Sequence, residues 1–331
     1  MDSLDDLDFL VINETRWFAT DDESIHQLSE PVKGNSVFFC QPVIRTTLIG
    51  ISPTPYKNYY LKKRKGSYDM ILFNVWKEGK NKCVTFSYDD GVVFDRRLIE
   101  IFDQYGVKGT FHLNSGLTSA VRIPVSEFYE VYQNHEVAVH GVQHVSLTLF
   151  PPQNVVVDIY EDRKALEAVL GKPIVGMSYA YGAYNEEVYG YLKACGIVYS
   201  RTTRSTKSFG LPENFLLWHP TCHHGEALDL CAPFLNVQYS RRTLFYIWGH
   251  SYEFDSNNNW DLIESVCEKI ARKDNVWYAT NIEIYDYIVA QKSLRISADN
   301  KIIINPTATD VWVTCSQNGV IKIPAGKTVQ L

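Results

Sequence analysis

The sequence predicts an α/β fold in which parallel strands form a closed or nearly closed barrel. From residue 82 onward, short strand-like runs alternate with longer helix-like segments. Several helix-like segments stop at a glycine, as at Gly106, Gly171 and Gly196, and glycine frequently ends helices. This alternation indicates crossover units that build a parallel sheet, and about seven of them are present, enough to close a barrel. An open, doubly wound sheet is the alternative fold.

The expected elements follow the chain in a regular order. Strands are expected at residues 82–88, 108–113, 136–140, 174–179, 197–201, 243–249 and 276–280. Helices are expected at residues 95–105, 125–134, 154–170, 185–195, 226–236 and 260–273. These elements assign residues 81–291 to the barrel.

Two flanking regions differ from the barrel in composition. Residues 1–80 are rich in Tyr, Pro and Lys and contain short strand-like runs, which indicates a β-rich N-terminal segment of unknown role. Residues 292–331 alternate polar and apolar positions between turn residues, which predicts a short β appendage packed on the barrel.

The composition limits the partners and the compartment. With 32 basic and 38 acidic residues, the net charge of −6 argues against nucleic acid, and no basic run suggests a membrane surface. No apolar stretch approaches the ~20 residues that span a bilayer. The seven cysteines lack C-x-x-C spacing, which is typical of reduced thiols, and the acidic start lacks the basic region of a secretion signal. We expect a cytoplasmic protein, and a chain trimmed of its leader would look the same.

Two adjacent carboxylates, Asp89 and Asp90, follow an apolar run, at the position where a parallel barrel presents side chains at its carboxyl edge. Neighbouring acids repel each other unless a positive charge lies beside them, and a metal dication is the commonest solution. In such a site one carboxylate binds the metal while its neighbour acts as a general base on a water molecule. A turn that caps the helix at residues 95–105 is the alternative interpretation.

Two histidines, His140 and His144, follow another predicted strand. Gly141 permits a sharp bend between them, and the H-x-x-x-H spacing places two imidazoles on one ion in zinc-binding helices. One carboxylate and two imidazoles leave a coordination position open, which is typical of a hydrolytic metal centre.

These motifs resemble those of the NodB-homology polysaccharide deacetylases, carbohydrate esterase family 4. Residues 85–91, residues 140–144 and a later His250 are similar to the family motifs T-F-D-D-G and H-[ST]-x-x-H and to its late histidine motif. The resemblance covers residues 82–290 and is strongest to a bacterial branch of the family.

The resemblance implies a distorted (β/α)-barrel of about seven strands. It also implies that Asp89 is the catalytic base and that a divalent metal is bound by Asp90, His140 and His144. Zinc is the expected metal, and the ligand set also suits cobalt or nickel.

The third family motif, R-x-P-Y-G, aligns with residues 178–182. The chain differs from this motif at two of the five positions. Ser178 stands where the resemblance predicts Arg, and Ala180 stands where it predicts Pro. Tyr181 remains, and its backbone N–H is expected to stabilise the oxyanion as part of the catalytic set. The missing Arg would pair with the base, and Arg201, at the end of another predicted strand, is the candidate substitute. An arginine solvated in a loop is the alternative.

His250 follows the strand-like residues 243–249, and the resemblance implies that it is the general acid that protonates the leaving group. A core histidine bonded to backbone is the alternative. Either Glu253 or Asp255 could orient the ring.

Further side chains are expected to bind substrate. Trp218 is expected to form a wall for a sugar, His223 to contact the substrate, and Asn114 to line the pocket. Trp248 is expected to stack on a sugar ring, and Arg201 completes this substrate-binding set. A second metal site in the histidine-rich residues 218–224 is the alternative use of this segment.

Three functions follow from these motifs. The leading hypothesis is a metal-dependent hydrolase that removes acetyl groups from an N-acetylated or O-acetylated carbohydrate. The second is an amidohydrolase acting on a small non-sugar amide, because the expected Arg is absent. The third is a catalytically silent glycan-binding protein on the same scaffold.

Overall fold

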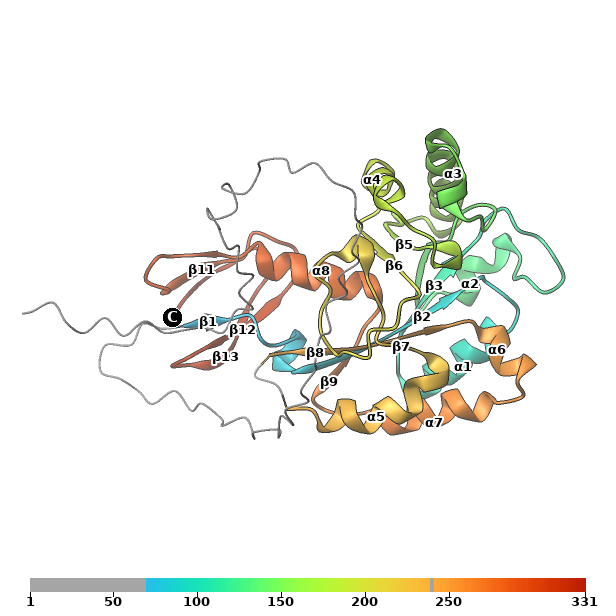
Figure 1. Ribbon diagram of the computed structural model, residues 1–331. Coiled ribbons are helices and arrows are strands. Elements are labelled where there is room, and N and C mark those ends of the chain that lie inside the picture. The colour runs from blue at the N-terminus through green and yellow to red at the C-terminus, as the bar shows by residue number, and fades with distance from the viewer. Residues whose placement is uncertain (1–69, 239–240) are drawn as a thin grey trace, which may run out of the picture. The chain divides into compact units, whose positions relative to one another are not determined.

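The structure is a computed structural model that describes residues 70–238 and 241–331. At its centre lies a parallel sheet of eight strands in the order β6-β5-β4-β3-β2-β8-β7, with β9 beside β2 (Figure 1). The strands are β2 (Lys82–Asp89), β3 (Gly109–Leu113), β4 (Glu136–Val139), β5 (Gly176–Ser178), β6 (Tyr199–Arg201), β7 (Cys222–His223), β8 (Thr243–Gly249) and β9 (Val276–Tyr278). All their pairings are parallel, so the carboxyl ends of the strands meet at one edge.

The sheet curls into an irregular barrel. One side of β2 pairs with β9 along residues 82–84 and with β3 along residues 86–89. At the other end of the strand order, Trp218 pairs with Arg201 of β6, and the strand β7 a few residues later pairs with β8. The segment from Trp218 to β7 therefore pairs with β6 at one end of the strand order and with β8 at the other. This pairing closes the barrel. The predicted distorted barrel is confirmed, and the doubly wound open sheet is wrong.

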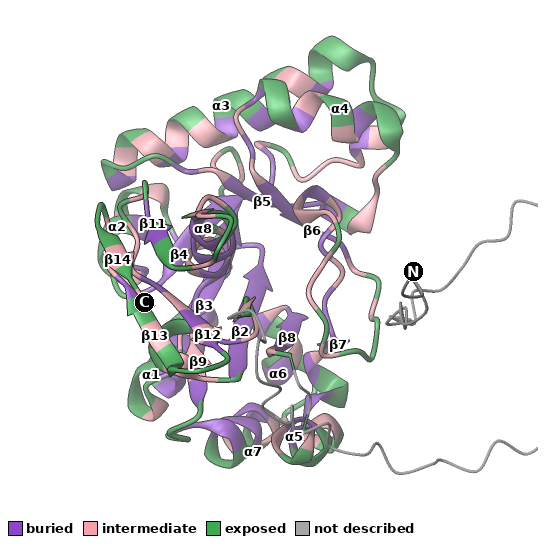
Figure 2. Ribbon diagram, turned by 90° about the vertical axis from the view of Figure 1, so that its left-hand side faces the viewer, coloured by how far each residue is buried: buried purple, intermediate pink, exposed green. Residues whose placement is uncertain are grey.

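Helices cover the outside of the barrel, and Figure 2 shows buried strands surrounded by helices with exposed faces. The helices are α1 (Asp95–Tyr105), α2 (Phe128–Val131), α3 (Pro152–Leu170), α4 (Glu186–Ala194), α5 (Ala227–Asn236), α6 (Ser251–Ser256), α7 (Trp260–Ile270) and α8 (Asn281–Lys292). Short 3-10 turns lie at Lys77–Gly79, Val125–Glu127, Leu147–Leu149, Ala180–Gly182, Phe215–Leu217 and His224–Glu226. Apolar faces such as Leu98 and Phe102 of α1 are buried in the core, which is the main source of helix stability.

Some predicted elements differ from the observed ones. The helix expected at residues 125–134 is reduced to a 3-10 turn and the four-residue α2, because the backbone leaves the helical region at Tyr132 and turns toward β4. The elements β7, α6 and α8 were not predicted. The start of α8 carries a capping box, in which Thr280 and Glu283 bond to each other's backbone N–H groups. Its T-x-x-E pattern is a signal that sequence reading could have used.

The C-terminal residues form two small antiparallel sheets. One contains β1 (Ile71–Leu72), β12 (Val311–Cys315) and β13 (Gly319–Ile323), and the other contains β10 (Arg295–Ile296), β11 (Ile302–Ile304) and β14 (Thr328–Gln330). Their shared core of Ile303, Val311, Val313 and Ile323 includes Ala290 from α8. The strand β1 comes before the barrel in the sequence, and it pairs with β12, which comes after the barrel.

The structure tests two expectations from composition only in part, because some of the residues concerned lie outside the described ranges. The β-rich interpretation of residues 1–80 falls outside them except for residues 70–80, which carry β1 and one 3-10 turn. The six cysteines in the described part are buried and free. Within residues 70–238 and 241–331, no helix has the length and apolar character needed to cross a membrane.

Candidate metal centre and active site

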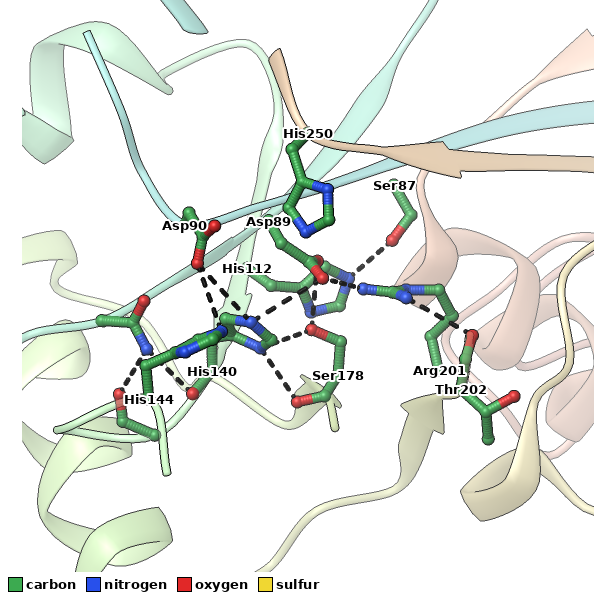
Figure 3. Close-up of polar contacts among 12 residues, drawn as sticks. Ser87, Asp89, Asp90, His112, His140, His144, Ser178, Arg201, Thr202 and His250 are labelled. Atoms are coloured by element: carbon green, nitrogen blue, oxygen red, sulfur yellow. Dashed lines mark hydrogen bonds and ion pairs between the residues drawn. The ribbon is translucent and has the colours of Figure 1, made fainter. Parts of the chain in front are cut away.

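Five strands deliver polar side chains to the carboxyl edge of the barrel (Figure 3). Asp89 is the last residue of β2, and Ser178 and Arg201 end β5 and β6. His140 directly follows β4, and His250 directly follows β8. Because the strands are parallel, residues from distant parts of the sequence meet here.

Asp90, His140 and His144 place one oxygen and two nitrogen donors within 4.8 Å of one another. Nε2 of His144 lies 3.4 Å, and Nε2 of His140 3.9 Å, from Oδ1 of Asp90. Ligands bound to tetrahedral zinc at ~2.0–2.1 Å are separated by roughly 3.3 Å, so this spacing suits one divalent ion. Among the residues that the structure describes, Oδ1 of Asp90 and Nε2 of His140 are buried and have no hydrogen-bond partner. The donor set therefore fits a metal, which would satisfy both atoms.

His140 is held in the form that a metal requires. Its Nδ1 lies 2.7 Å from Oγ and 3.1 Å from the carbonyl oxygen of Ser178. An Nδ1–H donated to that carbonyl leaves the lone pair on Nε2, facing the other donors. Burial lowers the pKa of His140 to about 4, although the charges of Asp89 and Asp90 act to raise it. The ring is therefore neutral at pH 7.

The loop that carries the two histidines has an unusual backbone. The φ angles of Gly141 and His144 are 82° and 51°, in the left-handed region. A Cβ at residue 141 would lie 2.3 Å from Oδ2 of Asp158 and would be strained at this φ, so both features favour glycine there. Asp90 also has a positive φ, of 86°. Left-handed backbone at non-glycine residues is costly and concentrates at functional sites.

Two buried side chains hold this loop in place. Asn114 donates from Nδ2 to the carbonyl oxygens of His140 and Gly141 at 2.9 and 2.8 Å. Asp162 accepts the backbone N–H groups of His140 and Ser115 at 3.1 and 2.7 Å. The expectation that Asn114 lines the substrate pocket is wrong, because its side chain is buried and its amide is used by the loop.

Asp89 lies beside the metal donors and is paired with a buried cation. Arg201 makes an ion pair with its Oδ2, and the hydroxyl of Ser178 donates to its Oδ1 at 3.1 Å. Burial alone would raise the pKa of Asp89, but the charge of Arg201, together with those of His140, His112 and His250, outweighs burial and holds the pKa well below its usual range. The carboxylate is ionised at neutral pH, as a general base must be.

His250 lies beside Asp89 in Figure 3. Its Nδ1 is 2.6 Å from Oε1 of Glu253, so of the two acids left open by the sequence it is Glu253 that binds the ring. Burial acts to lower the pKa of His250, but the hydrogen bond to Glu253 and the charges of Asp89 and Asp90 together raise it.

The residues expected to bind substrate differ in whether the structure leaves them exposed. Trp218 is 1% exposed and packs edge-to-face against Phe215 and Tyr246, so the prediction that it forms a sugar wall is wrong. The cause is its place in the segment that closes the barrel, which points the ring into the core. Arg201 is fully buried and therefore serves Asp89 rather than a substrate.

Three other candidates keep some solvent exposure. Trp248 is 9% exposed and packs its ring against the guanidinium of Arg201 and edge-on against His223. His223 is half-buried and bonded to Glu253. Tyr181 is 71% exposed, and its ring meets the ring of His144 edge-on at 4.6 Å.

Sequence reasoning missed several residues around the site. His112, in β3, is fully buried below Asp89 and bonds to Oγ of Ser87 at 2.8 Å. Its place inside the predicted strand at residues 108–113 was a usable signal. Asp162 lies within α3, and nothing in its local sequence marks it as a support for His140.

Comparisons with known proteins agree with this fold. The model of the polysaccharide deacetylase family matches residues 77–200. No curated protein matches the chain in sequence. A solved structure assigned as a polysaccharide deacetylase from Mycobacterium smegmatis is 19% identical, covers 66% of this chain and 93% of its own, and has a TM-score of 0.52. At this identity the likeness shows the fold alone.

Two other solved structures are more distant. The Xyl-CE4 domain of a multidomain xylanase from the hindgut metagenome of Trinervitermes trinervoides is 17% identical over 65% of this chain and 93% of its own, with a TM-score of 0.45. A family 4 acetyl xylan esterase from Clostridium thermocellum, in complex with a cobalt ion, is 14% identical over 62% of this chain and 90% of its own, with a TM-score of 0.41. With the match of the polysaccharide deacetylase model to residues 77–200 and its curled parallel barrel, the chain is similar to the polysaccharide deacetylases in that part of its sequence and in its fold.

Proposed function

We propose that this protein is a metal-dependent deacetylase that removes an acetyl group from an N-acetylated or O-acetylated carbohydrate. The observation that carries the proposal is an ionised, buried Asp89 immediately beside three metal donors, two of which are buried and have no hydrogen-bond partner. His250, with a raised pKa, lies close to the same carboxylate and can supply a proton. Base, metal donors and acid together match the needs of amide or ester hydrolysis.

Asp90, His140 and His144 would hold the metal. When bound, a divalent ion such as zinc, cobalt or nickel supplies Lewis acidity that activates water and polarises the acetyl carbonyl. Asp89 accepts a proton from the attacking water, and Arg201 keeps this carboxylate ionised before the step. Ser178 holds the second carboxylate oxygen and the ring of His140 together.

His250 donates the proton that the leaving nitrogen or oxygen needs when its bond to the acetyl carbon breaks. Glu253 accepts Nδ1–H, so the proton to be donated is the one on Nε2. The backbone N–H of Tyr181 would donate to the oxyanion, in a turn where Tyr181 has a φ of 58°. The exposed ring of Tyr181 beside His144 provides an aromatic surface on which a sugar can stack.

The metal centre can be tested by replacing its donors one at a time. The variants Asp90→Asn, His140→Ala and His144→Ala should lose both bound zinc and acetate release, because each removes one of three protein ligands. Metal content is measured by mass spectrometry, and acetate release is measured with chito-oligosaccharides, acetylated xylan and small cyclic amides. His219→Ala, a half-buried histidine outside the donor set, is the matched control.

Full zinc-dependent turnover by His140→Ala would overturn the assignment of the metal centre. Turnover of cyclic amides without any release of acetate from glycans would replace the carbohydrate substrate with a small amide. Bound zinc with no turnover of any of the three substrate classes would contradict the deacetylase proposal itself.

A further inference from the structure

A second group of histidines lies next to the acid His250. His223 ends β7, His224 begins the following 3-10 turn, and Glu253 lies in the first turn of α6. Nε2 of His223 and Nε2 of His224 lie 2.9 and 3.0 Å from Oε2 of Glu253. The other carboxylate oxygen, Oε1, binds Nδ1 of His250. Three imidazoles therefore share one carboxylate.

The distances distinguish this cluster from the metal centre. Ligand atoms on one tetrahedral ion stand roughly 3.3 Å apart, as the 3.4 Å between His144 and Asp90 approximates. The contacts of His223 and His224 with Glu253, at 2.9 and 3.0 Å, have the length of N–H···O hydrogen bonds. The donor atoms of His223, His224 and Glu253 are close enough to hold an ion, and their short separations favour a hydrogen-bonded network.

The proton positions follow from the partners of each ring. Nδ1 of His223 accepts the backbone N–H of Gly225 at 3.3 Å, so the proton of the neutral ring is on Nε2 and is donated to Glu253. An ionised carboxylate only accepts hydrogen bonds, so His224 also donates its Nε2–H. Burial would raise the pKa of Glu253, but its hydrogen bonds to His223, His224 and His250 lower it far more.

The ring of His224 is fixed by its surroundings. It stacks on Phe254 with ring centres 4.2 Å apart and on Tyr88 with ring centres 5.8 Å apart. Gly249 leaves the space that the ring needs, since a Cβ there would lie 2.0 Å from its Nδ1. His224 therefore anchors the network in the barrel core, while His223 and Glu253 are half-buried.

We propose that His223 and His224 are positioning residues for proton delivery. They donate hydrogen bonds to Oε2 of Glu253, which keeps Oε1 of Glu253 bonded to Nδ1 of His250. This bond fixes the tautomer of the His250 ring and the direction in which its Nε2 points. A glutamate side chain has several rotatable bonds and loses this position readily when it is held at one oxygen only. The inference rests on the proposed function for the role of His250, and it predicts a defect in proton transfer rather than in substrate binding.

The half-buried His223 is the first residue to change, because its replacement disturbs the core least. His223→Leu removes the N–H donor, and His223→Gln keeps a donor of similar reach. We expect kcat for acetate release to fall about tenfold in His223→Leu, with KM unchanged, and to be largely restored in His223→Gln. His219→Leu, four residues earlier in the chain and outside the network, should behave as the unchanged protein does. His224→Leu should repeat the loss if the variant folds.

A double-mutant cycle links the effect to Glu253. In the background of Glu253→Gln, which has already lost its carboxylate, His223→Leu should cause little further loss of kcat. Independent, additive losses would overturn the proposal. A rise in KM with an unchanged kcat would also overturn it, because His223 would then bind substrate.

Nitrogen NMR of His250 gives a readout that needs no substrate, so failure of the deacetylase function remains distinguishable. In the zinc-loaded protein, the neutral ring of His250 should carry its proton on Nδ1, and His223→Leu should produce a mixture of tautomers. An unchanged tautomer in His223→Leu would overturn the proposal. So would a second equivalent of zinc, bound by the unchanged protein and lost in His223→Leu, because the cluster would then be a metal site.

Discussion

Arg201 supplies the positive charge beside Asp89 that the family motif would take from an arginine at residue 178. The family resemblance predicts an arginine at residue 178, at the end of β5, where the chain has Ser178. Arg201 is the register partner of Ser178 on the neighbouring strand β6. The small serine binds one oxygen of Asp89, and the guanidinium takes the other. Asp89 thus has a cationic partner, which lies one strand away from the position that the motif predicts.

Replacing Arg201 by Met should therefore raise the pKa of Asp89, because the cation that stabilises its charge is lost. We expect the acidic limb of the kcat/KM profile to move to higher pH, and kcat/KM at pH 7 to fall about 10- to 100-fold. Rates of acetate release measured from pH 5 to pH 9 test this. An acidic limb at the same pH would show that Arg201 does not act on the base.

The same substitution leaves a buried carboxylate unpaired, which should lower the free energy of unfolding by about 3–5 kcal/mol. Asp89→Asn combined with Arg201→Met removes both charges and should recover much of this stability in urea denaturation. The double variant separates the structural cost from the loss of catalysis.

At the scale of elements, the loop after β4 decides whether the two histidines meet. The H-x-x-x-H spacing suggested one helical turn or a tight loop, and the chain uses a loop with left-handed residues at Gly141 and His144. Asn114, from the end of β3, and Asp162, from α3, secure its backbone. Neighbouring elements thus supply the rigidity that an isolated loop lacks.

Gly141→Ala should weaken zinc binding about tenfold, because a Cβ would collide with Asp158 and the φ of 82° is strained for alanine. Calorimetric zinc titration measures the effect. Gly190→Ala in α4 is the matched control, since a Cβ there meets no atom within 4 Å. This control should keep its zinc affinity and gain about 0.5–1 kcal/mol of stability. Equal zinc affinity in both variants would contradict the role of the loop.

At the scale of the whole molecule, the barrel has a polar network at the end opposite the candidate site. Glu136, the first residue of β4, is buried and accepts hydrogen bonds from Tyr199 at 2.5 Å, Thr110 at 2.8 Å and the backbone of Ile282 at 2.9 Å. Burial raises the pKa of Glu136 to about 7, although these hydrogen bonds act to lower it. The network ties β3, β4, β6 and the start of α8 together.

Glu136 should make stability depend on pH. Its carboxyl keeps its proton in the folded chain up to about pH 7 but loses it near pH 4.3 in the unfolded chain, so the free energy of unfolding falls between these values. Glu136→Gln cannot titrate, and its stability relative to the unchanged protein should rise by up to about 3 kcal/mol from pH 4.5 to pH 7.5.

Urea denaturation at several pH values tests this prediction. Glu130→Gln, on an exposed residue of α2, controls for the loss of one acidic side chain. A stability difference between Glu136→Gln and the unchanged protein that stays constant with pH would show that Glu136 is ionised in the folded chain.

Much of the fold could be predicted because its signals are local. The alternation of strands and helices, the glycine stops and the acid and histidine motifs are each contained in short stretches of sequence. Elements of few residues, such as β7 and α6, were missed because so short a run carries little periodicity. The predicted sugar wall at Trp218 failed because burial depends on how the barrel closes.

By itself, the sequence determined the barrel class and the residue types that could form a metal centre. Only the tertiary structure decided that Arg201 serves Asp89, that Glu253 rather than Asp255 binds His250, and that Trp218 is core. The physical reason is that these contacts join residues that share no local pattern. They depend on strand order, register and the closing of the barrel.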